Sequence, residues 1–248
     1  MKSDIFRAYD IRGIYPDDID EDGVFCIAQS FTKIIQENIK NDKPQIVIGR
    51  DMRVSSPALH QSAVAGVSSL GADVVDIDLA STPTFYFAVS ERGYDGGLEI
   101  SASHNPKEYN GVKIVREEAQ AMGLGNGLDK IRDACLADGQ TPTAAKGEIR
   151  KVSDSLAKRV DYALDFYDFS KIKPLKVVAD PANAMGAPDL EALFAKLPCE
   201  LIKMNFELDG TFPAHEADPF KTENVEDLRK KVVAEKADLG IATDGDAD

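Results

Sequence analysis

The chain has 248 residues, of which 43% are hydrophobic and 29% are charged, and this composition is typical of a soluble globular protein with one large or two ordinary domains. Its formal net charge of -14 disfavours a nucleic acid partner, whose phosphate backbone would repel it on average. No apolar run approaches the roughly 18 residues that a membrane span needs, which argues against a membrane partner.

The N-terminal residues and the cysteines predict a cytoplasmic location. Charges are scattered through MKSDIFRAYDIRG, residues 1–13, so we expect neither a secretory signal nor an anchor there. The cysteines Cys26, Cys135 and Cys199 are far apart and form no Cys-x-x-Cys motif. We therefore expect a reduced, cytoplasmic protein in which these thiols are structural.

In the first part of the chain, short apolar strands alternate with helical patterns. Strands are predicted over residues 44–49, 72–77 and 96–101. The first helix is expected to have Ser56 as its N-cap and Pro57 at its first helical position, and a second helix begins at Pro83. One face of the first helix gathers Leu59, Ala63, Val67 and Leu70. This order of elements predicts an α/β fold with a mostly parallel sheet covered by helices.

The same order returns in the second part. Strands are predicted over residues 173–180, 199–205 and 237–243, and helices over 153–168, over 186–197 and after Thr222. Ser153 or Ser155 is the expected cap of the first of these helices, whose apolar face is predicted to comprise Leu156, Val160, Ala163, Leu164 and Tyr167. Because residues 46–77 and 177–202 follow one plan, we predict two similar α/β domains, 1–150 and 151–248, each a mostly parallel mixed sheet covered by helices.

One serine lies at the break between two predicted strands, in SASHNPKEYNGVKI, residues 101–114. The Asn-Pro pair forces the chain out of the strand, because proline cannot donate a hydrogen bond to a neighbouring strand. Ser103 therefore lies on a loop at the carboxyl end of a strand, where open α/β sheets bind their ligands. Taken alone, the spacing favours a plainer alternative, in which Ser103, His104 and Asn105 only hydrogen-bond their own turn.

A group of acidic residues follows the last predicted strand. DLGIATDGDAD places Asp244, Asp246 and Asp248 at every second position, and Gly245 permits a tight turn. Carboxylate oxygens at this density suit Mg²⁺. The same pattern begins an EF-hand calcium loop, but that loop needs a helix ahead of it, where this sequence has an apolar strand. A solvated acidic tail is the remaining alternative.

Both motifs resemble those of the α-D-phosphohexomutases. SASHNPKEYNGVKI is similar to the family's signature loop, in which the serine before His-Asn-Pro carries a phosphoryl group, and DGDAD is similar to its metal loop. The resemblance implies that Ser103 is the phosphoserine and that Mg²⁺ is held beside it. The implied metal ligands are Ser103, Asp244, Asp246 and Asp248.

The same resemblance assigns further residues to the site. It implies that His104, Asn105 and Lys113 belong to it, with Lys113 acting in proton transfer or charge stabilisation. FRAYDIRGIYP, at the start of the chain, is similar to the opening of the phosphomannomutase/phosphoglucomutase branch. On that match Tyr9 and Arg12 line the active cleft, and the planar donor fork of Arg12 suits a phosphate.

Two more segments resemble the family without a clear catalytic role. In GRDMRVSSP, residues 49–57, we interpret Arg50 and Arg53 as structural. FPAHEADPF, residues 212–220, is similar to a loop of the second domain, which could place His215 near the site. A loop histidine with its hydrogen bonds satisfied is an equally good interpretation.

The resemblance implies a reversible transfer of a phosphoryl group between the 1- and 6-positions of a hexose phosphate, through a phosphoserine and a bisphosphorylated sugar. Mannose or glucose phosphate would be the substrate, with Mg²⁺ and an activating hexose 1,6-bisphosphate. The family has four domains and the resemblance reaches two, so we expect a fragment with little or no turnover. The alternatives are a phosphoglucosamine mutase, a non-catalytic metal- or phosphosugar-binding module, and a calcium-binding interaction protein.

Overall fold

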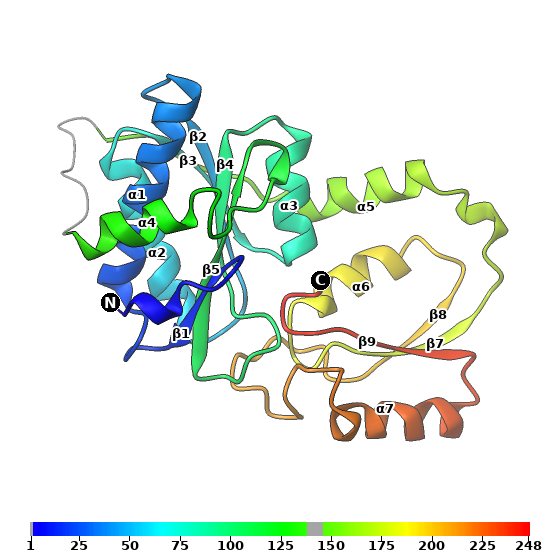
Figure 1. Cartoon of the computed structure of the whole chain (residues 1–248). Coiled ribbons are helices and arrows are strands. Elements are labelled where there is room, and N and C mark those ends of the chain that lie inside the picture. Colours follow the sequence, from blue (N-terminus) through cyan, green and yellow to red (C-terminus); the bar gives the residue numbers. More distant parts are fainter. Residues whose placement is uncertain (1, 138–145) are drawn as a thin grey trace.

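The computed structural model describes residues 2–137 and 146–248, which alternate strands and helices along most of their length (Figure 1). The first elements are β1 (Ile11–Ile14), α1 (Glu21–Ile39), β2 (Gln45–Arg50), α2 (Ser56–Ser69), β3 (Asp73–Leu79), α3 (Thr82–Glu91), β4 (Gly96–Ile100), β5 (Tyr109–Arg116), α4 (Leu128–Leu136) and β6 (Ile149–Lys151). There follow α5 (Ser155–Phe166), β7 (Lys176–Asp180), α6 (Gly186–Phe194), β8 (Glu200–Lys203), α7 (Thr222–Glu235) and β9 (Leu239–Ala242).

The first sheet has, within the described residues, six strands in the order β1-β5-β4-β2-β3-β6. The predicted strands 44–49, 72–77 and 96–101 form its parallel centre, where β2 pairs with β3 and β4. β5 runs antiparallel to β4 and β1, so the sheet is mixed. One hydrophobic cluster joins the sheet to α1, α2 and α4, and a second joins it to α3. The helices therefore cover both faces, as predicted for an α/β fold.

The second sheet is smaller and, in the part of the chain that the structure describes, parallel throughout, with the order β8-β7-β9. Figure 1 shows α6 and α7 on opposite sides of it. β7 is the central strand, and its Val177, Val178 and Ala179 are buried. Both sheets point the carboxyl ends of parallel strands toward the same region of the molecule, where β4 and β9 end (Figure 1). The domain boundary near residue 150 stays a prediction.

The structure corrects two predicted helix caps. The N-cap of α2 is Ser55, because Ser56 already lies in the helix and its hydroxyl donates to Asp51 Oδ1 at 2.5 Å. The N-cap of α5 is Asp154, and neither Ser153 nor Ser155 takes that position. In α2, the Asp51 carboxylate takes the Ser56 hydroxyl that was predicted to cap the helix.

The predicted apolar face of α5 is also too long. Tyr167 is the C-cap residue and is 65% exposed, so the face ends before it. Val160 is buried, whereas Leu156, Ala163 and Leu164 are half-buried. The helical spacing of apolar residues continues to Tyr167, but this side chain is exposed because the helix has already ended.

The structure also contains α1, α4, β1 and β6, which were not among the predicted elements. The side chain of Asp20 caps α1 by accepting from the Gly23 amide at 2.8 Å. The buried face of α1 includes Val24, Ile27, Phe31 and Ile35, at the spacing of an amphipathic helix. That signal is readable in the sequence, so α1 was predictable. No helix among the described residues is long and apolar enough to cross a membrane.

Candidate functional site

Ser103 lies on the loop that joins β4 to β5, at the carboxyl end of β4, as predicted. Its φ of 50° falls in the left-handed region, which a residue with a side chain adopts only when its surroundings hold it there. Its amide donates to Ser101 Oγ at 3.1 Å, and the residue is 4% exposed. The backbone conformation of the serine is therefore imposed by the fold around it.

The residue that holds this loop is Arg53, which is fully buried. Its Nε lies 3.1 Å from Asp51 Oδ2, so the buried charge is paired. Its guanidinium also donates to four carbonyl oxygens of the loop, those of Ser103 (2.8 Å), Asn105 (2.6 Å), Pro106 (2.7 Å) and Tyr109 (3.0 Å). This geometry agrees with the structural interpretation of Arg53 and ties it directly to the position of Ser103.

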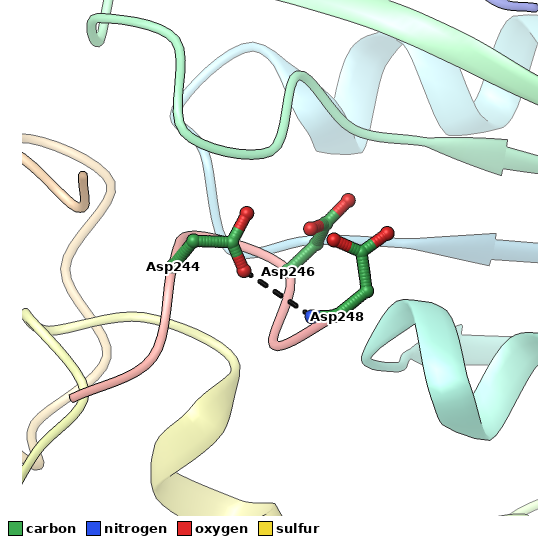
Figure 2. A group of neighbouring side chains, drawn as sticks. All are labelled: Asp244, Asp246 and Asp248. Carbon is green, nitrogen blue, oxygen red and sulfur yellow. Dashed lines mark hydrogen bonds between the residues drawn. The ribbon is translucent and has the colours of Figure 1, made fainter. Parts of the chain in front are cut away.

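The acidic loop, residues 243–248, follows β9 and reaches across to the serine loop, residues 101–108 (Figure 2). Ser103 Oγ donates to Asp244 Oδ2 at 2.5 Å, although the two residues are 141 positions apart. Gly245 makes this approach possible, because a Cβ at that position would lie 2.2 Å from the Ser103 carbonyl oxygen. The amide of Thr82, at the start of α3, donates to the Asp246 carbonyl at 2.9 Å. The two motifs therefore form one site.

The three aspartates provide a set of ligands that fits a divalent cation. Each can offer a carboxylate oxygen such that all three oxygens lie within 4.8 Å of one another, and their side chains converge (Figure 2). Asp246 Oδ2 accepts hydrogen bonds from Thr82 and Ser101. Asp246 Oδ1 is buried, and no amide, hydroxyl or ammonium group in the described ranges donates to it. A buried oxygen left without a donor is suited to a cation.

Lys113, on β5, points its ammonium group at the same carboxylates. Its Nζ lies 2.8 Å from Asp246 Oδ2 and 2.5 Å from Asp248 Oδ2. Burial lowers the pKa of Lys113, but the negative charge of Asp246 and the hydrogen bonds of Lys113 to Asp246 and Asp248 outweigh burial, and the pKa is raised overall. This environment favours a lysine that keeps its proton and neutralises charge.

The site shifts the pKa values of Asp244 and Asp246 in opposite directions. Burial raises the pKa of Asp244, and the charge of Asp246 adds to it, giving a pKa of about 7. Burial also raises the pKa of Asp246, but the charge and hydrogen bond of Lys113 outweigh it, so this pKa is lowered. Near neutral pH Asp246 is thus ionised while Asp244 is close to its midpoint.

Glu99 and Thr82 belong to this network and were missed by our sequence analysis. Glu99 is fully buried on β4, opposite Lys113 on β5. The Thr82 hydroxyl lies 2.7 Å from Glu99 Oε2 and 2.8 Å from Asp246 Oδ2, but it has only one hydrogen to donate. Burial raises the pKa of Glu99, so a protonated Glu99 can donate to Thr82 and leave the threonine hydrogen for Asp246. A glutamate inside the apolar strand GGLEI was the readable signal.

A cavity of about 620 Å³ opens beside these groups. Arg12 lines it and is held in place by Asp10 (2.8 Å from Nε) and by the Ala102 carbonyl (2.6 Å from Nη1). His104 Nδ1 lies 3.2 Å from Ser103 Oγ. The predicted site residues on its wall are Tyr9, Arg12, Ser103, His104, Lys113, Asp244 and Asp248. Asn105 does not line the cavity, but its Oδ1 lies 3.4 Å from Arg12 Nη1.

His215 is not among the residues that line this cavity. Its Nε2 lies 3.0 Å from Asp180 Oδ2, and its Nδ1 lies 2.9 Å from the Glu216 carbonyl. Both ring nitrogens thus have partners, one at the end of β7 and one in the next residue's carbonyl, which favours the interpretation of a satisfied loop histidine. From the same loop, Pro219 and the 93% exposed Phe220 line the cavity instead, and sequence reasoning did not single them out.

Comparison with known proteins extends these observations. Residues 3–137 match the family model described as phosphoglucomutase/phosphomannomutase, alpha/beta/alpha domain I, and residues 153–248 match that of domain II. A phosphomannomutase from Salmonella typhimurium is 37% identical over 98% of this chain and 53% of its own length. A phosphomannomutase/phosphoglucomutase from Pseudomonas aeruginosa is 35% identical over 100% of this chain and 51% of its own length.

The solved structures agree with the sequence relatives. A phosphoglucomutase/phosphomannomutase family protein from Burkholderia thailandensis superposes with a TM-score of 0.87 at 31% identity, covering 99% of this chain and 53% of that one. The chain spans about half the length of the curated relatives it matches. Its two matched segments together cover most of its residues. The chain therefore belongs to the phosphoglucomutase/phosphomannomutase family, of which it carries α/β/α domains I and II.

Proposed function

We propose that this protein takes part in the reversible transfer of a phosphoryl group between the 1- and 6-positions of a hexose phosphate. The observation that carries the proposal is the contact between Ser103 Oγ and Asp244 Oδ2 at 2.5 Å, inside a cluster of three carboxylates at the wall of a cavity. A nucleophilic hydroxyl next to a cation site is the arrangement that phosphoryl transfer requires. The names of the relatives support mannose or glucose phosphate as the substrate.

Ser103 would carry the phosphoryl group on Oγ, donate it to a sugar hydroxyl and take back the other phosphoryl group from the bisphosphorylated sugar. The protonated Lys113 and the guanidinium of Arg12 would offset the negative charge of the group in transfer. His104 lies within 3.2 Å of Ser103 Oγ and can exchange a proton with the atom that gains and loses phosphate. Tyr9, 76% exposed at the cavity wall, is placed to contact the sugar.

The metal of this reaction would be Mg²⁺, held by Asp244, Asp246 and Asp248, with an oxygen on Ser103 as a further ligand. When bound, the cation supplies positive charge beside the phosphoryl oxygens. Thr82, which contacts both Glu99 and Asp246, would hold the Asp246 carboxylate in place beside the other two aspartates. A cytoplasmic location is a further part of the proposal, supported by the scattered cysteines.

The experiment that tests the proposal is a phosphopeptide map after incubation of the chain with a hexose 1,6-bisphosphate and Mg²⁺. We expect phosphate on Ser103 and none on Ser101, which lies two residues away and provides an internal control. The Asp246→Asn variant should lose this phosphorylation while its circular dichroism stays native.

Two results would count against the proposal. Phosphate on Ser101, or on several serines alike, would mean that Ser103 is not the specific carrier. A folded chain that binds Mg²⁺ but takes up no phosphate, even at long incubation, would favour the non-catalytic metal-binding module. If Ser103 does take up phosphate, a side-by-side comparison of mannose 1,6-bisphosphate and glucose 1,6-bisphosphate as donors would distinguish the two proposed substrates.

A further inference from the structure

One large apolar side chain at the wall of the site cavity is left in solvent. Phe220 is 93% exposed, more than any other large hydrophobic side chain in the described ranges, and it lines the same cavity as Ser103. A phenylalanine stabilises a fold through the ring surface that it removes from water. The fold therefore gains little from this ring, and an exposed apolar group at a cavity points to a ligand.

The backbone under Phe220 is held by a hydrogen-bonded turn. Residues 218–221 form this turn, with Pro219 at its second position and a 3.3 Å bond from the amide of its last residue to the Asp218 carbonyl. The Phe220 amide donates to Asp218 Oδ1 at 3.1 Å, and the Asn224 side chain donates to the Asp218 carbonyl at 2.9 Å. Because α7 begins directly after the turn, the ring projects from a fixed point of the backbone.

The segment before the turn connects this point to the acidic loop. Ala217 is 3% exposed and belongs to the same buried apolar cluster as Phe212. Its Cβ lies 3.7 Å from the position that a Cβ of Gly245 would occupy. Ala217 thus packs against the loop that carries the three aspartates, and this contact positions Phe220, three residues further on, with respect to them.

The lining of the cavity combines two kinds of side chain. The charged and hydrogen-bonding groups of the site are one kind, and the aromatic rings of Tyr9, Tyr86 and Phe220 are the other. A hexose phosphate has the same two kinds of surface, since its phosphate and hydroxyl groups surround a ring whose faces carry C–H groups. The polar side chains suit the phosphate and the hydroxyls, whereas aromatic rings suit the C–H groups.

We propose that Phe220 contacts the substrate by packing against the C–H face of the hexose ring. The inference rests on the proposed phosphoryl transfer and assigns recognition of the sugar body to this residue. Apolar contact has no fixed direction, unlike a hydrogen bond. Phe220 can therefore hold the bisphosphorylated sugar with either phosphorylated end turned toward Ser103, as transfer between the 1- and 6-positions requires.

Phe166 provides a matched control on another part of the surface. It lies on α5, is 71% exposed and is not among the residues that line the site cavity. The chain contains no tryptophan, so a tryptophan introduced at either position is the only one in the protein. Its fluorescence then reports the surroundings of that position alone.

The first test measures binding by fluorescence, which does not depend on transfer. Titration of the Phe220→Trp variant with glucose 1,6-bisphosphate and Mg²⁺ should change the emission in a saturable way. Inorganic phosphate should leave the emission unchanged, because it lacks the sugar ring. The Phe166→Trp variant should respond to neither compound.

The second test separates binding from chemistry. In the Phe220→Ala variant, the glucose 1,6-bisphosphate concentration that half-saturates phosphate uptake by Ser103 should rise roughly tenfold, with the maximal rate unchanged. Phe220→Tyr keeps the ring and should restore the value of the unmodified protein. Urea unfolding of Phe220→Ala should be unchanged because the side chain is exposed. Phe166→Ala should alter none of these quantities.

The outcomes separate this inference from the proposed function. Calorimetric binding of the bisphosphate that weakens in Phe220→Ala, without phosphate on Ser103, would support the inference and contradict phosphoryl transfer. Phosphate on Ser103 with an unchanged half-saturating concentration in Phe220→Ala would overturn the inference and leave the proposed function intact. An equal emission change with inorganic phosphate, or a loss of stability in Phe220→Ala, would also overturn it. A natively folded chain that does not bind the bisphosphate at all would contradict both.

Discussion

The serine loop is held from within its own sheet, whereas the acidic loop is held mainly by groups on the other sheet. Arg53, the residue that fixes the Ser103 loop, is fully buried and follows β2 of the same sheet. The acidic loop leaves the end of β9, a strand with half-buried or exposed residues, and finds its partners on α3, β5 and the serine loop.

The two loops therefore depend on different parts of the protein for their geometry. We expect the serine loop to keep most of its left-handed backbone without the second sheet, because Arg53 and Asp51 hold it from the first sheet. We expect the geometry of the acidic loop to depend on docking, since several of its contacts cross between the sheets. We therefore expect changes in the first loop to affect folding, and changes in the second to affect docking and metal binding.

The largest expected effect comes from Arg53→Ala. The change leaves Asp51 buried without its ion-pair partner and four loop carbonyls without their donor, so it should destabilise the protein by about 3–5 kcal/mol. Urea unfolding measures this free energy. Arg50→Ala is the matched control, because Arg50 pairs with the half-exposed Asp78 and should cost about 1 kcal/mol or less. Equal losses in the two variants would refute a special role for Arg53.

The Gly245→Ala variant tests whether the acidic loop must approach the serine loop closely. The added methyl group would lie 2.2 Å from the Ser103 carbonyl oxygen, so the two loops must separate. We expect a cost of about 1–3 kcal/mol in stability and a loss of phosphate uptake by Ser103. Gly93→Ala is the control, because Gly93 has a φ of +63° but open space around it, and phosphate uptake should be unchanged. Normal uptake in Gly245→Ala would show that the close approach is unnecessary.

Metal binding should depend on pH through Asp244. Its pKa of about 7 in the metal-free protein means that it is protonated below this pH, and a cation must displace the proton. Affinity for Mg²⁺ should therefore fall by up to about tenfold per pH unit below pH 7 and level off above it. Calorimetric titrations at pH 6, 7 and 8 measure this slope. In Asp244→Asn the affinity should be lower at every pH and independent of pH in this range.

The smallest expected effect comes from His215, whose contacts lie outside the cavity. Its hydrogen bond to Asp180 raises the pKa of His215. Burial raises the pKa of Asp180, but its hydrogen bonds to His215 and Asn205 outweigh burial and lower it overall. The histidine's contribution is complete below its unfolded pKa of about 6.5 and is lost as pH rises through the folded value.

The contribution of Asp180 has the opposite sign, since it is complete above the unfolded pKa of about 4 and is lost as pH falls. The pair is therefore strongest between about pH 4 and pH 6.5. His215→Gln should cost about 1 kcal/mol in this window and less at pH 8, with phosphate uptake by Ser103 unchanged. Thermal unfolding at pH 5.5 and pH 8 tests the difference, and a loss of phosphate uptake would place His215 in the site after all.

The amino-acid sequence by itself determined most elements and the residue types of the site. Apolar runs and helical periods predicted the central strands of both sheets, because these patterns depend on residues close together in the chain. The same reasoning could have found α1, whose cap and apolar face are both local. Resemblance to a family, not spacing, supplied the idea that Ser103 and the three aspartates act together.

Only the tertiary structure decided which polar groups meet inside the protein. The hydrogen bonds from Arg53 to the Ser103 loop, and the link from Glu99 through Thr82 to Asp246, join segments that are distant in sequence. A buried polar side chain takes whichever partner the packing brings within reach, and packing is set by the whole fold.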